Sequence, residues 1–191
     1  MKFTIHRGTQ EIGGSCVEIW TDTTRLVIDI GMPLVGLDQS KFDSRAIEGQ
    51  SIRELRVQGI LPDIDGLYSD GGSVSLILSH AHQDHYGLMN LIHDSCPVYL
   101  GEATHRLVEL TNLVLNKNWS IKSPQHFSPG ESFSIGNIDI TPFLMDHSAF
   151  DAYAFLIEAD GKSIFYSGDF RTHGRKAGAI KWLEENVKPG I

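Results

Sequence analysis

The chain has 191 residues, of which 41% are hydrophobic and 21% charged, and its formal net charge at pH 7 is −8. That size and composition suit one globular domain with a substantial core. The acidic balance argues against a free-standing nucleic-acid binder, which usually presents a basic face. It is compatible with an enzyme that acts on nucleic acid through metal ions.

Neither a membrane span nor a secretory leader is expected. No apolar run approaches the ~20 residues that a bilayer requires, and the N-terminal segment MKFTIHRG lacks the apolar core of a signal peptide. The two cysteines, Cys16 and Cys96, lie in apolar runs and are predicted to be small core residues rather than a disulfide. We therefore expect a cytoplasmic protein in a reducing compartment, with no membrane partner.

In the first part of the chain, strands precede a long irregular segment. A glycine-rich turn at residues 8–15 separates the first two strands, and residues 21–24 join the second strand to the third. Residues 32–73 are less regular, with one helix expected near residues 45–58, and such a segment in a compact domain is often functional. The three strands are expected over residues 2–6, 16–20 and 25–31.

The second part of the chain mixes strands and helices. Residues 74–78 form a continuous apolar run, which predicts a strand covered on both faces. Two hairpins are expected over residues 131–145 and 152–169, with turns at Gly136-Asn137 and Asp160-Gly161. This mixture indicates a layered α/β or α+β fold with helices outside the sheets. The other expected elements are helices over 86–94, 102–116 and 177–187, a strand over 96–101 and a final turn over 188–191.

A dense group of potential metal ligands follows the strand at 74–78. His80, His82, Asp84 and His85 form the pattern H-x-H-x-D-H, and imidazole and carboxylate are ligands that zinc prefers. Alternation places His80 and His82 on one side of an extended segment, while Asp84 and His85 follow where the chain turns into a helix. Such a turn can aim two ligand pairs at two neighbouring metal sites. A polar loop that contains histidines by chance is the less favoured alternative, because the chain has only nine histidines.

Three further residues occupy comparable positions. Asp29, His147 and Asp169 each follow an apolar, strand-like run, as His80 does. Taken singly, the two aspartates could form turns and His147 could cap a helix or face solvent. If these strand ends gather at one edge of a sheet, however, all three side chains join the histidine cluster.

The ligand motif together with Asp29, His147 and Asp169 resembles the metallo-β-lactamase fold superfamily. The segments GTQEIGGSCVEI, LPDIDGLY and YSGDFRTHGR are similar to its RNA-processing branch, which includes J-type ribonucleases and cleavage-and-polyadenylation-type nucleases that carry a β-CASP domain. The resemblance covers nearly the whole chain. It implies an αββα sandwich over residues 1–191 and a phosphodiester hydrolase with RNA as its substrate.

The resemblance also implies a role for each ligand. His80, His82 and His147 would hold a first zinc ion, Asp84 and His85 a second, and Asp169 would bridge the two. Asp29 would orient a histidine by a hydrogen bond without touching the metal. A hydroxide between the ions would be the nucleophile, and Asp84 would also act in catalysis by orienting it. Manganese is the alternative metal.

One departure from the superfamily concerns the second metal. Its members usually carry a further histidine on that metal late in the chain, whereas after Asp169 this sequence has only His173, four residues on. We therefore expect residues 1–191 to be the N-terminal portion of a larger enzyme, with the β-CASP domain and the C-terminal part of the lactamase fold following. Open sheet edges of a partial fold favour a homodimer or completion by that missing region. A smaller departure is Tyr86-Gly87-Leu88, where many relatives have an apolar residue and two glycines.

Several residues keep two interpretations each. Ser15 and Glu11 border the active site or simply form a tight turn, and Ser148 and Asp151 contact substrate or cap a helix. Arg171, His173 and Arg175 bind phosphate or belong to a solvated loop. The remaining histidines are expected to be ordinary surface or helix residues, namely His6, His93, His105 and His126.

Three hypotheses for the function follow. The leading one is a dinuclear zinc hydrolase domain that cleaves phosphodiesters in RNA, or less readily in DNA. The second is a small-molecule hydrolase of the same fold that acts on thioesters or lactones, which the acidic net charge slightly favours. The third is an inactive fragment or scaffold, which the missing ligand motivates.

Overall fold

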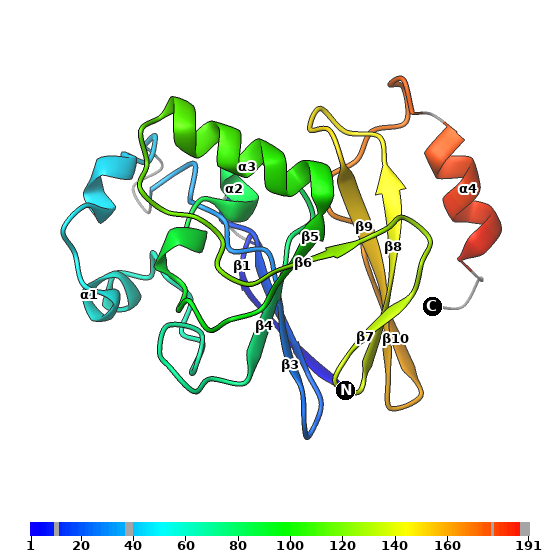
Figure 1. Ribbon diagram of the computed structural model, residues 1–191, viewed down its shortest axis with the longest axis horizontal. Helices are drawn as coiled ribbons and strands as arrows, with labels where there is room; N and C mark the ends of the chain where they lie inside the picture. The colour runs from blue at the N-terminus through cyan, green and yellow to red at the C-terminus, as the bar shows by residue number, and fades with distance from the viewer. Residues whose placement is uncertain (10–11, 37–39, 177, 188–191) are drawn as a thin grey trace.

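The computed structural model describes residues 1–9, 12–36, 40–176 and 178–187. Two β-sheets face each other, with helices α1 to α3 packed on the outer face of the first sheet and α4 on the outer face of the second (Figure 1). This four-layer arrangement confirms the predicted αββα sandwich. Glu11, residue 177 and the expected turn over 188–191 lie outside the described residues.

The first sheet has the strand order β1-β2-β3-β4-β5-β6. Strands β1, β2 and β3 pair antiparallel, whereas β3, β4, β5 and β6 pair parallel. Because the carboxyl ends of parallel strands meet at one edge, the residues that follow β3 and β4 lie side by side. The strands span Lys2–Arg7 (β1), Cys16–Trp20 (β2), Arg25–Ile28 (β3), Val74–Ile77 (β4), Val98–Gly101 (β5) and Pro124–Phe127 (β6).

The second sheet has the order β10-β9-β8-β7 and is antiparallel throughout. Both predicted hairpins are confirmed, with turns at Gly136-Asn137 and Asp160-Gly161. Asp160 and Gly161 have φ of 51° and 66°, a conformation that two-residue hairpin turns require and that Asp and Gly tolerate. The strands span Phe133–Ile135 (β7), Ile138–Met145 (β8), Ala152–Ala159 (β9) and Lys162–Tyr166 (β10).

The helices differ from expectation in two places. The single helix expected over 45–58 is a 3-10 turn, Ser44–Ile47, and a separate helix α1, Ile52–Val57, because Gly49 between them has φ of 73°. The helix expected over 86–94 is wrong, since α2 spans Gln83–Tyr86 and only a 3-10 turn, Met89–Leu91, follows. The other two expected helices are confirmed as α3 (Glu102–Val114) and α4 (Gly178–Asn186).

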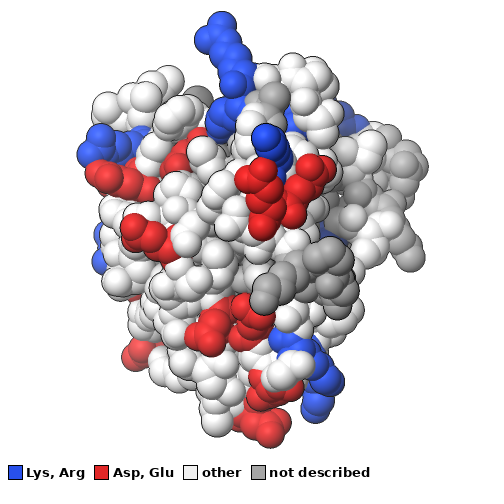
Figure 2. Space-filling view, turned by 90° about the vertical axis from the view of Figure 1, so that its right-hand side faces the viewer, with Lys and Arg blue, Asp and Glu red and all other residues white. Residues whose placement is uncertain are grey.

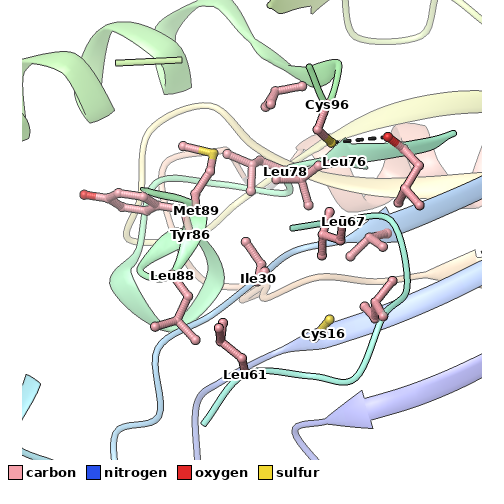
Figure 3. Close-up of a cluster of buried hydrophobic side chains, with 14 of the residues drawn as sticks. Cys16, Ile30, Leu61, Leu67, Leu76, Leu78, Tyr86, Leu88, Met89 and Cys96 are labelled. Carbon is pink, nitrogen blue, oxygen red and sulfur yellow. Dashed lines mark hydrogen bonds between the residues drawn. The ribbon is translucent and has the colours of Figure 1, made fainter. Parts of the chain in front are cut away.

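Buried side chains form a core on each side of the first sheet and a third beneath α4. Figure 3 shows the core under α1 to α3, in which Cys16 and Cys96 lie among leucines and Met89. Both cysteines are buried and free, as predicted. No helix within the described residues is long and apolar enough to cross a membrane.

Neither thiol is expected to react with a disulfide reagent at neutral pH while the chain is folded. Burial raises the pKa of Cys96 to about 11, and burial next to Asp29 raises that of Cys16. A thiol with that pKa is about 10⁻⁴ thiolate at pH 7, and the thiolate is the reactive form. Labelling followed by absorbance should be slow in buffer and complete in denaturant, whereas fast labelling of the native chain would contradict the burial.

Candidate metal centre

The predicted ligands come together at the edge where β3 and β4 end, between the two sheets at the upper end of Figure 1. His80 and His82 follow β4, and His85 lies in α2. His147 follows β8 and Asp169 follows β10, so both sheets contribute. The expected gathering of strand ends at one edge is therefore present.

A close backbone contact holds α2 against the end of β3. The Ile30 amide donates to the His85 carbonyl at 2.8 Å, and the Met32 amide donates to the Gln83 carbonyl at 2.9 Å. Gly31 lies between them, and a Cβ added there would be 1.7 Å from the carbonyl oxygen of Asp84. Glycine at this position therefore allows the ligand-bearing turn to approach β3.

His80, His82 and His147 form the first of two ligand groups found among the described residues. His82 Nδ1 lies 3.1 Å from His80 Nε2 and 3.1 Å from His147 Nε2. Two nitrogens bound to a tetrahedral zinc are about 3.3 Å apart. His82 Nδ1 carries at most one proton, so it cannot make a full hydrogen bond to both of the other nitrogens. A cation between the three nitrogens would bind all of them at once. The donors therefore fit zinc.

The second group consists of His80, His85 and Asp169, whose ligand atoms lie within 4.8 Å of one another. Asp169 Oδ2 is 3.6 Å from His85 Nε2 and 3.8 Å from His147 Nε2, so this carboxylate faces both groups. Asp84 Oδ2 lies 3.9 Å from His85 Nε2, at the edge of the second group. This placement is compatible with a bridging Asp169 and with Asp84 beside the second position.

Asp29 is fully buried behind the two groups, at 0% exposure. Its Oδ1 accepts from the Ser79 amide at 2.8 Å, and its Oδ2 accepts from the Ser79 and Tyr166 hydroxyls, each at 2.7 Å. Oδ2 also contacts His85 Nδ1 at 2.7 Å, which places a His85 proton on Nδ1 and makes Nε2 the nitrogen that faces the site. A hydrogen bond between Asp29 and a candidate ligand, His85, is therefore present.

Ser79 links Asp29 to a second candidate ligand, His80. Because the Ser79 hydroxyl donates to Asp29, it is free to accept from His80 Nδ1, which lies 2.9 Å away. This arrangement leaves the Nε2 lone pair of His80 directed at the metal position. The roles of Ser79 and Tyr166 were not predicted from the sequence. Their only signal is position, directly before His80 and three residues before Asp169.

Burial and neighbouring charges determine which side chains of the centre are protonated. Burial, aided by the charge of His85, lowers the pKa of His80 to about 3. Burial also opposes a charge on His85, but Asp29 and Asp169 on either side outweigh it and raise its pKa to about 10. The hydrogen bond with His85 lowers the pKa of Asp169 to about 2. A metal at His85 Nε2 would replace that proton, because ligand histidines are neutral.

Two of the residues near the centre that had two interpretations keep a possible contact with substrate, and one has a structural role. Ser148 and His173 are exposed beside His147 and Asp169, so a contact with substrate stays a prediction for both. Arg171 donates from Nε to Asp146 Oδ1 at 3.2 Å, and Asp146 is only 1% exposed, so this arginine anchors the loop after β10.

Asp151 caps a helix. Its Oδ2 accepts from the Thr104 amide in the first turn of α3 at 2.8 Å, and its Oδ1 accepts from the Tyr153 hydroxyl at 2.6 Å. The Asp151 carbonyl also accepts from the Thr104 hydroxyl at 2.9 Å. Its side chain is therefore committed to the protein, and it ties the loop that carries His147 to α3.

Replacing Asp151 with alanine is expected to lower the free energy of unfolding by about 2 kcal/mol, because it leaves the buried Thr104 amide without its acceptor. Urea unfolding followed by circular dichroism measures the change. Ser148→Ala is the matched control, since that side chain is exposed in the same loop. Equal unfolding midpoints for the two variants would argue against the capping role.

Comparisons with known proteins agree with this geometry. Residues 71–185 match the family model described as a beta-lactamase superfamily domain. Ribonuclease J of Helicobacter pylori is 26% identical over 177 residues, which cover 90% of this chain and 23% of that protein. An RNase J-like protein of Methanocaldococcus jannaschii is 27% identical over 175 residues, which cover 86% of this chain and 35% of that protein. The chain thus spans about a quarter to a third of the length of these curated relatives.

Solved structures share the fold. A crystal structure of a protein of unknown function from Enterococcus faecalis superimposes with a TM-score of 0.78 at 22% identity, over 96% of this chain and 47% of that one. The metallo-beta-lactamase fold protein YhfI from Bacillus subtilis superimposes with a TM-score of 0.55 at 16% identity, over 87% of this chain and 61% of that one. The match to the family model shows that the chain belongs to the metallo-β-lactamase superfamily, and its sequence relatives support the ribonuclease J-like branch.

Proposed function

We propose that this chain is a metal-dependent hydrolase domain that binds two zinc ions and cleaves phosphodiester bonds in RNA. The observation that carries the proposal is the pair of adjoining ligand groups, which share His80 and are both faced by Asp169. The superfamily supports divalent metal and hydrolysis. Zinc rather than manganese is favoured by three imidazoles in the first group.

Bound zinc would lower the pKa of an attacking water to about 7 and stabilise charge on the phosphoryl oxygens. The chain's own residues would hold the ligands and the water in place. Asp29 fixes His85 directly and His80 through Ser79, so neither ring has to reorganise during the reaction. Asp84 would accept a hydrogen bond from the attacking water and so aim it at phosphorus.

RNA as substrate is supported by the relatives named ribonuclease J and by local charge. Figure 2 shows lysine and arginine side chains projecting from the upper end of the face that carries α4, the end at which the metal centre lies in Figure 1. Over the rest of that face, acidic side chains are mixed with further lysine and arginine side chains. Arg175 is exposed in the segment between Asp169 and α4, where a phosphate backbone would meet it. Arg171 and Lys176 in the same segment bond instead to Asp146 and to the Met145 carbonyl. Cytoplasmic location and self-association or completion by further chain remain part of the proposal.

The chain reconstituted with zinc, or separately with manganese, is expected to cleave an end-labelled RNA and a small phosphodiester. Removing the metal with a chelator should abolish both reactions. A thioester substrate is assayed in parallel, with metal content measured on the same preparation. Thioester turnover without phosphodiester cleavage would support the small-molecule hydrolase. One bound metal ion or none, together with no hydrolysis, would support the inactive fragment or scaffold.

A further inference from the structure

A second pair of histidines meets outside the metal centre. His105 in α3 and His126 in β6 are 21 positions apart in the chain, yet His105 Nδ1 lies 3.0 Å from His126 Nε2. Glu109, one helical turn beyond His105, places its Oε1 3.3 Å from His105 Nε2. None of these three residues belongs to the two ligand groups around His80.

The protons of His105 can be assigned from its surroundings. Its side chain is 13% exposed, and its Nε2 is buried with no hydrogen-bond partner among the described residues. The nearby Glu109 carboxylate favours a proton on Nε2, because an unprotonated nitrogen would face the carboxylate with like partial charge. The Nδ1 lone pair then points at His126. A carboxylate behind a histidine whose other nitrogen is free is the arrangement that supports metal-ligating histidines.

The spacing of the two nitrogens fits coordination to one metal ion. With metal–nitrogen bonds of about 2.0–2.1 Å, two nitrogens at right angles on an ion lie about 2.9 Å apart, and two on a tetrahedral ion about 3.3 Å. The observed 3.0 Å lies between these values, so the choice of metal rests on the ligand types and on relative affinity. Tetragonal coordination by nitrogen and oxygen is typical of Cu²⁺ and Ni²⁺, and Cu²⁺ binds such ligands most strongly among the first-row divalent ions.

We propose that His105 and His126, supported by Glu109, form a separate surface site that binds Cu²⁺, or Ni²⁺ more weakly, at two adjacent coordination positions, with water at the others. His126 is exposed, so its proton can move to its outer nitrogen when the metal binds. The bound ion would join α3 to β6, which is one of the two edge strands of the first sheet. The site does not depend on the proposed hydrolase function.

The test uses the 191-residue chain loaded with zinc and then titrated with Cu²⁺, with released zinc measured in the same samples. The bound copper minus the released zinc should reach one mole per mole of chain. Its electron paramagnetic resonance spectrum should show coupling to two imidazole nitrogens. His126→Ala should abolish this equivalent, and because the side chain is exposed the fold should be unaffected. His93→Ala, which removes a histidine elsewhere on the surface, should retain it.

Glu109→Gln provides a second variant with unchanged shape, and it should weaken copper binding about 10–100-fold. If the wild-type chain takes up no copper beyond that matched by released zinc, the proposal is overturned. The same holds if His126→Ala keeps the same equivalent and spectrum. Either result would mean that His105 Nδ1 and His126 Nε2 are joined by a hydrogen bond and do not bind copper.

Discussion

Replacing His82 with alanine is expected to remove metal from the first ligand group and to slow hydrolysis by roughly 10³-fold or more. His82 Nδ1 is the atom on which the 3.1 Å contacts to His80 and His147 converge, so its loss leaves two nitrogens with no third partner. Without the metal, the attacking water keeps the high pKa of bulk water instead of about 7. Zinc content by elemental analysis and the rate on a small phosphodiester measure the two effects.

His93→Ala is the control for this experiment. Its Nδ1 contacts the Ser95 hydroxyl at 2.8 Å in a local turn, away from the ligand groups, so metal content and rate should stay at wild-type values. The His82 side chain is only partly buried, and its removal should leave the unfolding midpoint of the metal-free chain nearly unchanged. A His82→Ala variant that keeps its full zinc content and rate would refute the first group as a metal site.

Replacing Asp29 with alanine is expected to lower the free energy of unfolding of the metal-free chain by about 3–5 kcal/mol and to weaken zinc binding about 10–100-fold. The change leaves buried donors on Ser79 and Tyr166, and a charged His85, without the carboxylate that accepts from them. Urea unfolding without metal measures the first effect, and competition with a zinc-binding dye measures the second.

Asp29→Asn separates the two effects. The amide preserves shape and one acceptor oxygen, so it should lose less stability than the alanine variant. Its other group is a donor, however, and it meets the Nδ1–H of His85, which favours the wrong tautomer or a rotated ring. Zinc affinity should therefore fall nearly as far as in Asp29→Ala. Unfolding of Asp29→Ala at the wild-type urea concentration would show that this carboxylate is not required for stability.

Much of the ligand cluster was predictable because it depends on local order in the chain. His80 and His82 follow a strand of a parallel sheet, and the ends of such strands meet without further information. The support behind them was not predictable, because Ser79 and Tyr166 reach Asp29 across 50 and 137 positions of sequence. The roles of the individual ligands on a metal remain predictions.

The prediction of secondary structure failed where tertiary contacts outweighed the local pattern of apolar residues. The apolar run that begins at Leu88 suggested a helix, but these side chains fill the core beneath the first sheet, and the helix lies before them at Gln83–Tyr86. Strand β6 was missed because it is short and at the sheet edge, and its central residues, Gln125 and His126, are exposed polar ones. Such a strand lacks the apolar alternation on which sequence reasoning relies.

The shared attachment of His80 and His85 to Asp29 has an evolutionary consequence. A substitution at position 29 disturbs both histidines at once, and a change at Ser79 or Tyr166 removes a partner of the same carboxylate. Single replacements at these three positions should therefore be rarely accepted, whereas compensating pairs can survive. Positions 29, 79 and 166 are accordingly expected to vary together among related chains, although they lie far apart in sequence.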